Sequence, residues 1–286
     1  MQRVKSYESP ASISEVIELL AERPGAKLLA GGTDLIIALN EWVISPPGII
    51  DLKRVPELKE IHDDISGLRI GSMVTFSEIS ENVCIRSKWT ALSEAASVVA
   101  APQIRNRATI GGNVANGAVA ADSVPALMAL GATAELVSVR GIRHVPVSEL
   151  MLDLNATAIG PDELLTCFRL PNLGAVSAFE KIGRRKAQAI SRICLATALN
   201  MDGDRVERAH IAVGAAGRRA YLCPEVSELL IGHTLDEERI KSASYKMEQH
   251  VAQVLGERPT AHYKKRIAAA SLENALLRLQ GGQQSC

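Results

Sequence analysis

Aromatic residues are scarce in this chain of 286 residues, of which only 3% are phenylalanine, tryptophan or tyrosine. A net charge is also lacking, because 32 lysines and arginines balance 32 aspartates and glutamates. A protein that coats nucleic acid needs surplus cations to neutralise phosphates and aromatic rings on which bases stack. The composition therefore excludes a general nucleic-acid-binding module.

Closely spaced cysteines and long apolar runs are missing as well. The five cysteines are an odd number, and no two of them form a C-x-x-C pair: Cys84, Cys167, Cys194, Cys223 and Cys286. This scatter excludes a disulfide framework and argues against a zinc or iron–sulfur site on this chain, so no metal ligands are expected. The first residues contain no apolar signal-peptide core, and no apolar run reaches the roughly 20 residues of a membrane span. We expect a cytoplasmic protein with reduced thiols.

What the chain does have is enough apolar sequence, 47%, for a folded protein of two or three domains. The first part predicts a small α/β unit, in which an apolar strand at 27–30 leads through Gly31-Gly32 into a helix opening at Thr33-Asp34. A further strand is expected at 48–52 after a proline-rich break.

From about residue 58 the alternation of strands and helices restarts, and after 174 it changes to consecutive strands followed by helices. In the second part, Thr109-Ile110 is expected to be a short strand entering Gly111-Gly112, and Asp122 opens a helix that contains Pro125. Residues 115–121 are expected to form a loop. We therefore divide the chain into residues 1–57, 58–174 and 175–286.

The two Gly-Gly turns, AGGTD at 30–34 and TIGGN at 109–113, are the most informative motifs. Glycine pairs let a backbone approach a ligand closely, and main-chain N–H groups beside a helix start favour a bound anion such as pyrophosphate. Each turn can equally be a tight connection with no ligand. Neither fits the G-x-G-x-x-G fingerprint or the phosphate-binding P-loop, so neither nucleotide-binding fold is supported.

Taken together, AKLLAGGTDLI, PQIRNRATIGGNVANGAVAADSVPALMALGA and PDELLTCFRLP resemble the FAD-binding medium subunits of the molybdenum hydroxylases. That family includes bacterial xanthine, nicotinate and carbon monoxide dehydrogenases, and the resemblance is strongest to the xanthine dehydrogenase branch. It implies an α+β protein with the FAD-binding fold of vanillyl-alcohol oxidase and para-cresol methylhydroxylase, built of two α/β lobes. A C-terminal domain of antiparallel strands and helices, like that of the carbon monoxide dehydrogenase flavoprotein, would follow them.

The resemblance also implies which residues hold FAD. The first turn would wrap the pyrophosphate with main-chain N–H groups: Lys27, Leu28, Leu29, Ala30, Gly31, Gly32, Thr33 and Asp34. The second turn would make a further phosphate and ribityl contact: Thr109, Ile110, Gly111, Gly112 and Asn113. Four more positions match cofactor-lining residues of the family: Val99, Asp122, Leu165 and Lys181. Asp122 can also be a helix cap and Leu165 a core residue.

As a member of this family, the chain would be an electron-transfer subunit. A molybdopterin-binding large subunit and a small subunit with 2Fe–2S clusters would be its partners, and NAD⁺ or another acceptor would take the electrons from its FAD. No side chain of this chain is expected to act as acid or base, because the cofactor carries the reaction. Two alternatives are a self-contained FAD oxidoreductase of the same fold and a flavin-free scaffold whose Gly-Gly turns are only turns.

Overall fold

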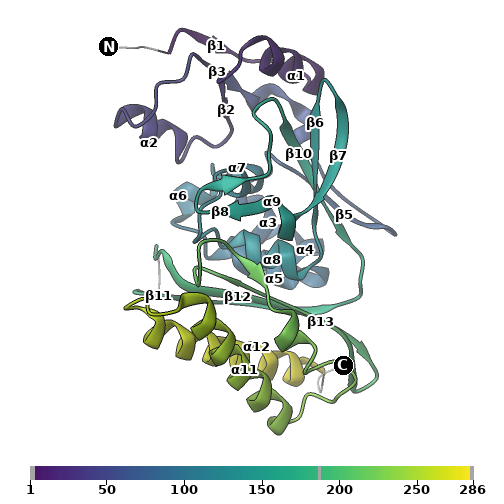
Figure 1. The fold of residues 1–286 in the computed structure, drawn as a ribbon. Helices are drawn as coiled ribbons and strands as arrows, with labels where there is room; N and C mark the ends of the chain where they lie inside the picture. Colours follow the sequence, from purple (N-terminus) through teal and green to yellow (C-terminus); the bar gives the residue numbers. More distant parts are fainter. Residues whose placement is uncertain (1–3, 186–187, 284–286) are drawn as a thin grey trace.

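The computed structural model describes residues 4–185 and 188–283. It has three tiers, seen in Figure 1: a small N-terminal lobe, a middle lobe with a five-stranded sheet and short helices, and a C-terminal sheet carrying two long helices. This arrangement confirms the α+β fold expected from the sequence, with two α/β lobes followed by antiparallel strands and helices.

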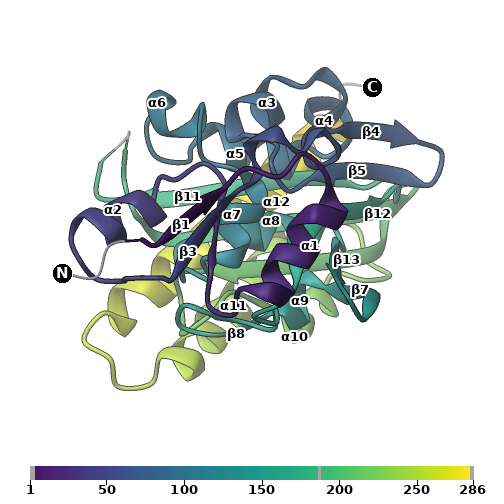
Figure 2. The ribbon, with the colours of Figure 1, turned by 90° about the horizontal axis from the view of Figure 1, so that it is seen from above.

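The N-terminal lobe is a three-stranded parallel sheet that lies in front of the rest in Figure 2. Its strands lie in the order β1 (Ser6–Glu8), β3 (Gly48–Asp51) and β2 (Lys27–Leu29). Helix α1 (Ile13–Glu22) begins where the Ser12 hydroxyl accepts a hydrogen bond from the Glu15 N–H, and it buries Val16 and Leu20 against the sheet's core. Strand β2 is an edge strand of this sheet, and the chain continues from its end into the first Gly-Gly turn.

The middle lobe is built on an antiparallel sheet in the order β4-β5-β10-β6-β7. Its strands are β4 (Ile61–Asp64), β5 (Gly67–Gly71), β10 (Leu164–Pro171), β6 (Thr133–Ser138) and β7 (Gly141–Pro146). Its helices are α3 (Phe76–Glu81), α4 (Val83–Lys88), α5 (Thr90–Ser97), α6 (Pro102–Arg105), α7 (Ile110–Ala115), α8 (Ser123–Ala129) and α9 (Val147–Leu150). The 3-10 turns η1 (Leu52–Arg54) and η2 (Pro56–Lys59) enter this lobe, and the small hairpin β8 (Met151–Asp153) and β9 (Ala156–Thr157) flanks it.

The expected strand at Thr109-Ile110 is wrong, because these residues start helix α7. The Thr109 hydroxyl accepts a hydrogen bond from the Gly112 N–H at 3.1 Å and so caps the helix. Only a single bridge, between Thr109 and Thr75, has strand-like pairing. The helix takes in both glycines and ends at Ala115, so the expected loop begins one residue later.

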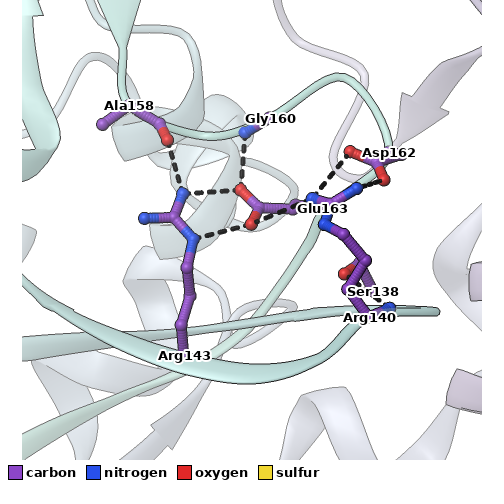
Figure 3. Close-up of polar contacts among 7 residues, drawn as sticks. All are labelled: Ser138, Arg140, Arg143, Ala158, Gly160, Asp162 and Glu163. Carbon is purple, nitrogen blue, oxygen red and sulfur yellow. Dashed lines mark hydrogen bonds and ion pairs between the residues drawn. The ribbon is translucent and has the colours of Figure 1, made fainter.

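An arginine–carboxylate cluster fastens the loop that precedes β10 to the hairpin of β6 and β7 (Figure 3). Glu163 accepts hydrogen bonds from both Nε and Nη2 of Arg143, at 2.6 and 2.7 Å, and from the Gly160 N–H at 2.6 Å. Arg143 also donates to the Ala158 carbonyl, while Arg140 pairs with Asp162. Bidentate pairing of this kind fixes geometry as well as charge, so the start of β10 is held against the hairpin.

The C-terminal tier is an antiparallel sheet in the order β11-β12-β13-β14 with helices on its outer face. The strands are β11 (Val176–Gly183), β12 (Ser191–Asp202), β13 (Arg205–Gly214) and β14 (Tyr221–Leu222). The helices are α10 (Pro224–Ser227), α11 (Glu237–Leu255) and α12 (Ala261–Gln283).

This sheet is buried on both faces. Along β12, Cys194, Ala196 and Ala198 belong to the apolar core of the middle lobe, while their neighbours Ile193 and Leu195 belong to the core under α11 and α12. Successive side chains of a strand point to opposite faces, so one strand serves two cores. Figure 1 shows the sheet between α5 and α8 on one side and α11 and α12 on the other.

In the described part of the chain, no helix combines the length and apolar character needed to cross a membrane.

Candidate functional site

The first Gly-Gly turn offers main-chain donors that the protein itself does not use. In the described residues, the N–H groups of Gly31, Gly32, Thr33 and Asp34 donate no hydrogen bond to any protein acceptor. The Gly31–Thr33 segment is only partly buried, and Gly32 adopts a φ of +76°, a conformation that glycine reaches cheaply. Unpaired N–H groups gathered in one turn are a suitable cradle for an anion.

Helix α2 (Leu35–Asn40) begins directly after this turn. Asp34 occupies the N-cap position, but its side chain makes no capping hydrogen bond. The helix starts where the sequence predicts and ends at Asn40, shortly before the chain turns at Trp42, whose φ is +59°. The free N–H groups therefore lie at the positive end of a short helix.

The structure brings the two Gly-Gly turns together, although they are almost 80 residues apart in sequence. The Arg107 Nε donates to the Gly31 carbonyl at 3.4 Å. A Cβ atom on Gly31 would lie 2.7 Å from the Arg107 carbonyl carbon, and a Cβ atom on Gly112 would lie 3.7 Å from the Ala30 Cβ. The two motifs thus form one continuous surface between the N-terminal and middle lobes.

The second turn uses its main-chain donors within the protein. The Gly111 N–H donates to the Ser72 carbonyl at 2.9 Å, the Gly112 N–H to the Thr109 hydroxyl, and the Asn113 N–H to the Thr109 carbonyl. Asn113 keeps a free side-chain amide donor, because its Oδ1 accepts from the Ser123 hydroxyl at 2.7 Å. What this turn offers a ligand is therefore close approach at Gly112 and the Asn113 amide.

Asp122 and Lys181 meet in a buried ion pair, with 2.6 Å between the Lys181 Nζ and the Asp122 Oδ2. Asp122 occupies the N-cap position of α8, but its side chain makes no capping hydrogen bond. The carboxylate pairs with Lys181 instead of capping the helix. Burial raises the pKa of Asp122 above its ordinary value, and the opposing effects of Lys181, Ser191 and Cys194 offset this rise only in part. No hydrogen bond or ion pair between described residues links this pair directly to the first turn.

Three other predicted site residues have their side chains in the core. Ile110 is fully buried, and Val99 and Leu165 are less than a tenth exposed within the middle-lobe cluster. Leu165 pairs with Leu136 across the sheet. At the other extreme, Lys27 is exposed on the edge strand, while Leu28 and Leu29 are partly buried.

Two arginines hold the site's loops, a role that the sequence did not reveal. Arg107 donates to the Gly31 carbonyl, and Arg105 donates from Nη1 to the Val99 carbonyl at 3.0 Å and to the Ala100 carbonyl at 3.4 Å. Ala100 has a φ of +41°, unusual for a residue with a side chain. The sequence carried no signal for this strained turn, because alanine is not typical of it.

Ser123 and Ser191 are further residues that the sequence did not mark as part of the site. Each donates a hydroxyl hydrogen bond to a predicted site residue, Ser123 to Asn113 and Ser191 to Asp122. Within residues 4–185 and 188–283, no group of three or more histidines, cysteines, aspartates or glutamates is placed to hold a metal ion. The free main-chain donors of the first turn are suited to holding a phosphate-bearing ligand.

Comparison with known proteins gives two family matches that together cover nearly the whole chain. Residues 2–173 match the family described as the FAD binding domain in molybdopterin dehydrogenase. Residues 177–279 match the CO dehydrogenase flavoprotein C-terminal domain.

Individual relatives are similar over almost their full length. The chain is 35% identical over 251 residues to a putative xanthine dehydrogenase FAD-binding subunit of Escherichia coli, with 86% of each chain covered. It is 34% identical over 272 residues to the nicotinate dehydrogenase FAD-subunit of Eubacterium barkeri, with 92% of each covered. Among solved structures, a chain of carbon monoxide dehydrogenase from Hydrogenophaga pseudoflava superposes with a TM-score of 0.89 at 28% identity, covering 97% of both chains.

Proposed function

Because the chain belongs to the FAD-binding medium subunits of the molybdenum hydroxylases, we propose that it is the electron-transfer subunit of a complex of the xanthine dehydrogenase type. The observation that carries this proposal is the 35% identity to a xanthine dehydrogenase FAD-binding subunit over 86% of both chains. The nearly equal identity to a nicotinate dehydrogenase subunit supports the alternative that the complex acts on another heterocycle.

The residues of this chain fit the cofactor. The free N–H groups of Gly31, Gly32 and Thr33 suit the pyrophosphate, which we expect to be held there by main-chain hydrogen bonds. Gly112 allows close approach from the other side, and the Asn113 amide can donate to a ribityl or phosphate oxygen. When bound, FAD supplies a redox group that exchanges electrons singly with iron–sulfur centres and as a pair with an acceptor.

The chain's own contribution is binding and orientation. Arg105 and Arg107 stabilise the two loops that border the cofactor by donating to their carbonyl groups. No proton transfer is assigned to a side chain, since the described site offers main-chain donors and a buried ion pair rather than a free acid or base. We propose that a molybdopterin-binding large subunit and a 2Fe–2S small subunit complete the complex in the cytoplasm, and that NAD⁺ or another acceptor takes the electrons.

The test is reconstitution of the purified chain with FAD, followed by removal of free flavin. We expect the protein to retain about equimolar flavin, visible in the two absorption bands of the oxidised ring, and Gly32→Val to lose it because the side chain is strained at a φ of +76°. Gly281→Ala, at an open position in α12, is the matched control and should retain flavin. A wild-type chain that is folded and binds no flavin would overturn the proposal.

The role as a subunit is tested by adding partners. Bound flavin should be reduced by a heterocyclic substrate only when the large and small subunits are both present, and NAD⁺ should then reoxidise it. Substrate turnover by this chain alone would favour a self-contained oxidoreductase.

A further inference from the structure

The loop of residues 116–121, which lies between α7 and α8, is held by two residues with unusual backbone conformations. The Asn155 N–H donates to the Gly117 carbonyl at 3.1 Å, and the Ala215 N–H donates to the Val119 carbonyl at 3.0 Å. Asn155 has a φ of +52°, and Ala215 has a φ of +59°, which alanine rarely adopts. Such conformations persist only where the surrounding structure enforces them, and they cluster at segments that hold ligands.

This loop is the direct continuation of the second Gly-Gly turn. Helix α7, which contains that turn, ends at Ala115, and the Gly117 N–H donates back to the Val114 carbonyl at 3.0 Å. Only three residues separate Gly117 from Asn113. A Cβ atom on Gly117 would lie 3.0 Å from the Ala156 nitrogen, so the loop packs backbone to backbone against the β8–β9 hairpin. A displacement of this hairpin would therefore move the end of the helix that carries Asn113.

Two arginines of the C-terminal tier hold the hairpin that contains Asn155. Arg218, in the loop between β13 and β14, donates from Nε and Nη2 to the two Asp153 carboxylate oxygens at 2.6 and 2.8 Å. Arg219 donates from Nη1 to the Met151 carbonyl at 2.8 Å. Bidentate pairing fixes orientation as well as distance, and the hairpin lies between α7 and the C-terminal sheet in Figure 1. The C-terminal tier thus sets the position of the hairpin.

A lysine of helix α12 holds the other contact. Ala215 is the first residue after β13, and its carbonyl accepts a hydrogen bond from the Nζ of the partly buried Lys264 at 2.5 Å. The same residue donates its N–H to the loop at Val119. Hydrogen bonds on both sides of Ala215 therefore maintain its unusual φ and connect α12 to the loop.

We propose that Arg218, Asp153 and Lys264 are positioning residues of the cofactor site, which act on FAD by holding residues 117–119 and with them the end of α7 that carries Asn113. This inference rests on the proposed function. The Arg218 side chain is 62% exposed, and an exposed ion pair adds little to global stability. The consequence of the Arg218–Asp153 pair is therefore local order beside the second Gly-Gly turn.

The experiment measures the Kd for FAD and the visible circular dichroism of the bound flavin in the full chain. Arg218→Gln should raise the Kd about threefold, because one exposed ion pair is lost. Lys264→Met should raise it about tenfold, because the Ala215 carbonyl loses its charged donor. The dichroism bands should change in both variants, since they depend on how the protein orients the flavin. Arg218→Lys keeps the charge without the bidentate geometry and should give an intermediate Kd.

Double variants test whether the residues act as described. Asp153→Asn should raise the Kd no further in an Arg218→Gln background, because both changes remove the same contact and coupled residues are not additive. Arg218→Gln and Lys264→Met should multiply their effects, since they release different points of the loop. If Asp153→Asn shows its full effect in the Arg218→Gln background, the two residues do not act as a pair and the proposal is overturned.

Arg140→Gln is the matched control. The Arg140 side chain is also 62% exposed and also pairs with an aspartate, Asp162, but on the hairpin of β6 and β7 (Figure 3), where Arg143 still holds the neighbouring loop. This variant should bind FAD as the wild type does. An increase in Kd equal to that of Arg218→Gln would mean that the loss of any exposed ion pair weakens binding, which would overturn the specific role of Arg218.

Urea unfolding of the cofactor-free variants separates positioning from general destabilisation. Arg218→Gln should unfold at the same urea concentration as Arg140→Gln and still show the altered flavin dichroism, whereas a purely structural role would leave the dichroism of the bound flavin unchanged. Should Lys264→Met fail to fold, Arg218→Gln and the double variant with Asp153→Asn carry the test. A wild-type chain that binds no FAD contradicts the proposed function. Wild-type affinity and dichroism in Arg218→Gln and Lys264→Met contradict this inference alone.

Discussion

Gly31 and Gly111 are glycines because the protein's own backbone passes close to them. A Cβ on Gly31 would meet the Arg107 carbonyl, and one on Gly111 would lie 2.7 Å from the Ser72 carbonyl oxygen. Gly32 and Gly112 face less crowded surroundings, where the nearest atoms belong to side chains. The two glycines of each turn therefore have different roles: the first lies tightly against the protein's own backbone, and the second lies at the proposed ligand surface.

Gly31→Ala is expected to weaken both the fold and cofactor binding. Its methyl group forces the first turn away from the loop that contains Arg107, and overpacking of this kind costs about 1–3 kcal/mol. Urea unfolding of the cofactor-free protein measures the loss of stability, and FAD titration measures the loss of affinity. Gly281→Ala serves as the control and should change neither property adversely, since nothing lies within 4 Å of its added Cβ. Unchanged FAD affinity in Gly31→Ala would mean that contact between the turns is not needed for binding.

At the scale of elements, Glu135 holds three strands together. From β6 it accepts hydrogen bonds from Arg169 and Thr166 on β10, at 2.8 and 2.7 Å, and contacts His144 on β7. Burial acts to raise the pKa of Glu135, but Arg169, Thr166 and His144 outweigh it and lower the pKa from 4.5 to about 2. A carboxylate with a lowered pKa stabilises the fold when it is ionised.

The stability of the protein should therefore fall as the pH decreases through the range between 4.5 and about 2. The contribution of Glu135 is fully present above its unfolded-state pKa and is lost as the folded-state group takes up a proton. We expect it to be on the order of 2 kcal/mol, because water screens the half-exposed Arg169 and His144. Glu135→Gln should be less stable than the wild type at neutral pH and should lose less stability on acidification.

Denaturant unfolding at a series of pH values, from neutral to about pH 3, measures this slope. Glu18→Gln, an exposed position on α1, is the control and should follow the wild-type curve. Parallel curves for Glu135→Gln and the wild type would show that the strand contacts of Glu135 do not set the acid response.

The elements that the sequence predicted well are those with a strong local signal. The strand before the first Gly-Gly turn, the strand at 48–52 and the helix that opens at Asp122 are where expected. Helix α7 was missed because Thr109-Ile110 carries β-branched residues before two glycines, a pattern typical of a strand end. In the structure, the Gly112 N–H donates to the Thr109 hydroxyl, and this capping hydrogen bond favours a helix over a strand at these residues.

The site could be predicted only as far as its motifs extend along the chain. Both Gly-Gly turns were found, and their meeting is visible only in the structure. Ser191 joins Asp122 across 69 positions, and nothing near either residue in the sequence marks the pair. Which main-chain donors remain free also depends on the fold, since Gly111 and Gly31 look alike in the sequence and differ in their hydrogen bonds.

At the scale of the whole molecule, the middle lobe and the C-terminal sheet share one core. Phe179, Cys194, Ala196 and Ala212 from the sheet pack in the same cluster as the apolar residues of α5 and α8. Arg278 on α12 adds ion pairs to both Glu94 on α5 and Glu180 on β11. The proposed division at 174–175 thus crosses a continuous apolar interface.

A fragment of residues 1–174 should therefore not fold as a stable unit. It would expose the faces of α5 and α8 that the sheet covers, and it would leave Asp122 without Lys181. Circular dichroism with heating should show no sharp transition for the fragment, in contrast to the full chain, and FAD should not be retained. A sharp transition with bound FAD would show that the first two lobes fold on their own.

Strand β12 is covered on both faces and paired with a strand on each side. Its amide protons should therefore exchange with solvent more slowly than those of the other elements. Its amide protons can exchange with solvent only when both cores open together, so they report the global opening of the protein. The Gly31–Asp34 amides, unpaired and near the surface, will exchange at once in the empty protein and slow down when a ligand covers them. One deuterium-exchange measurement thus reports two processes separately. The Gly31–Asp34 amides report ligand binding, and the β12 amides report the global opening of the protein.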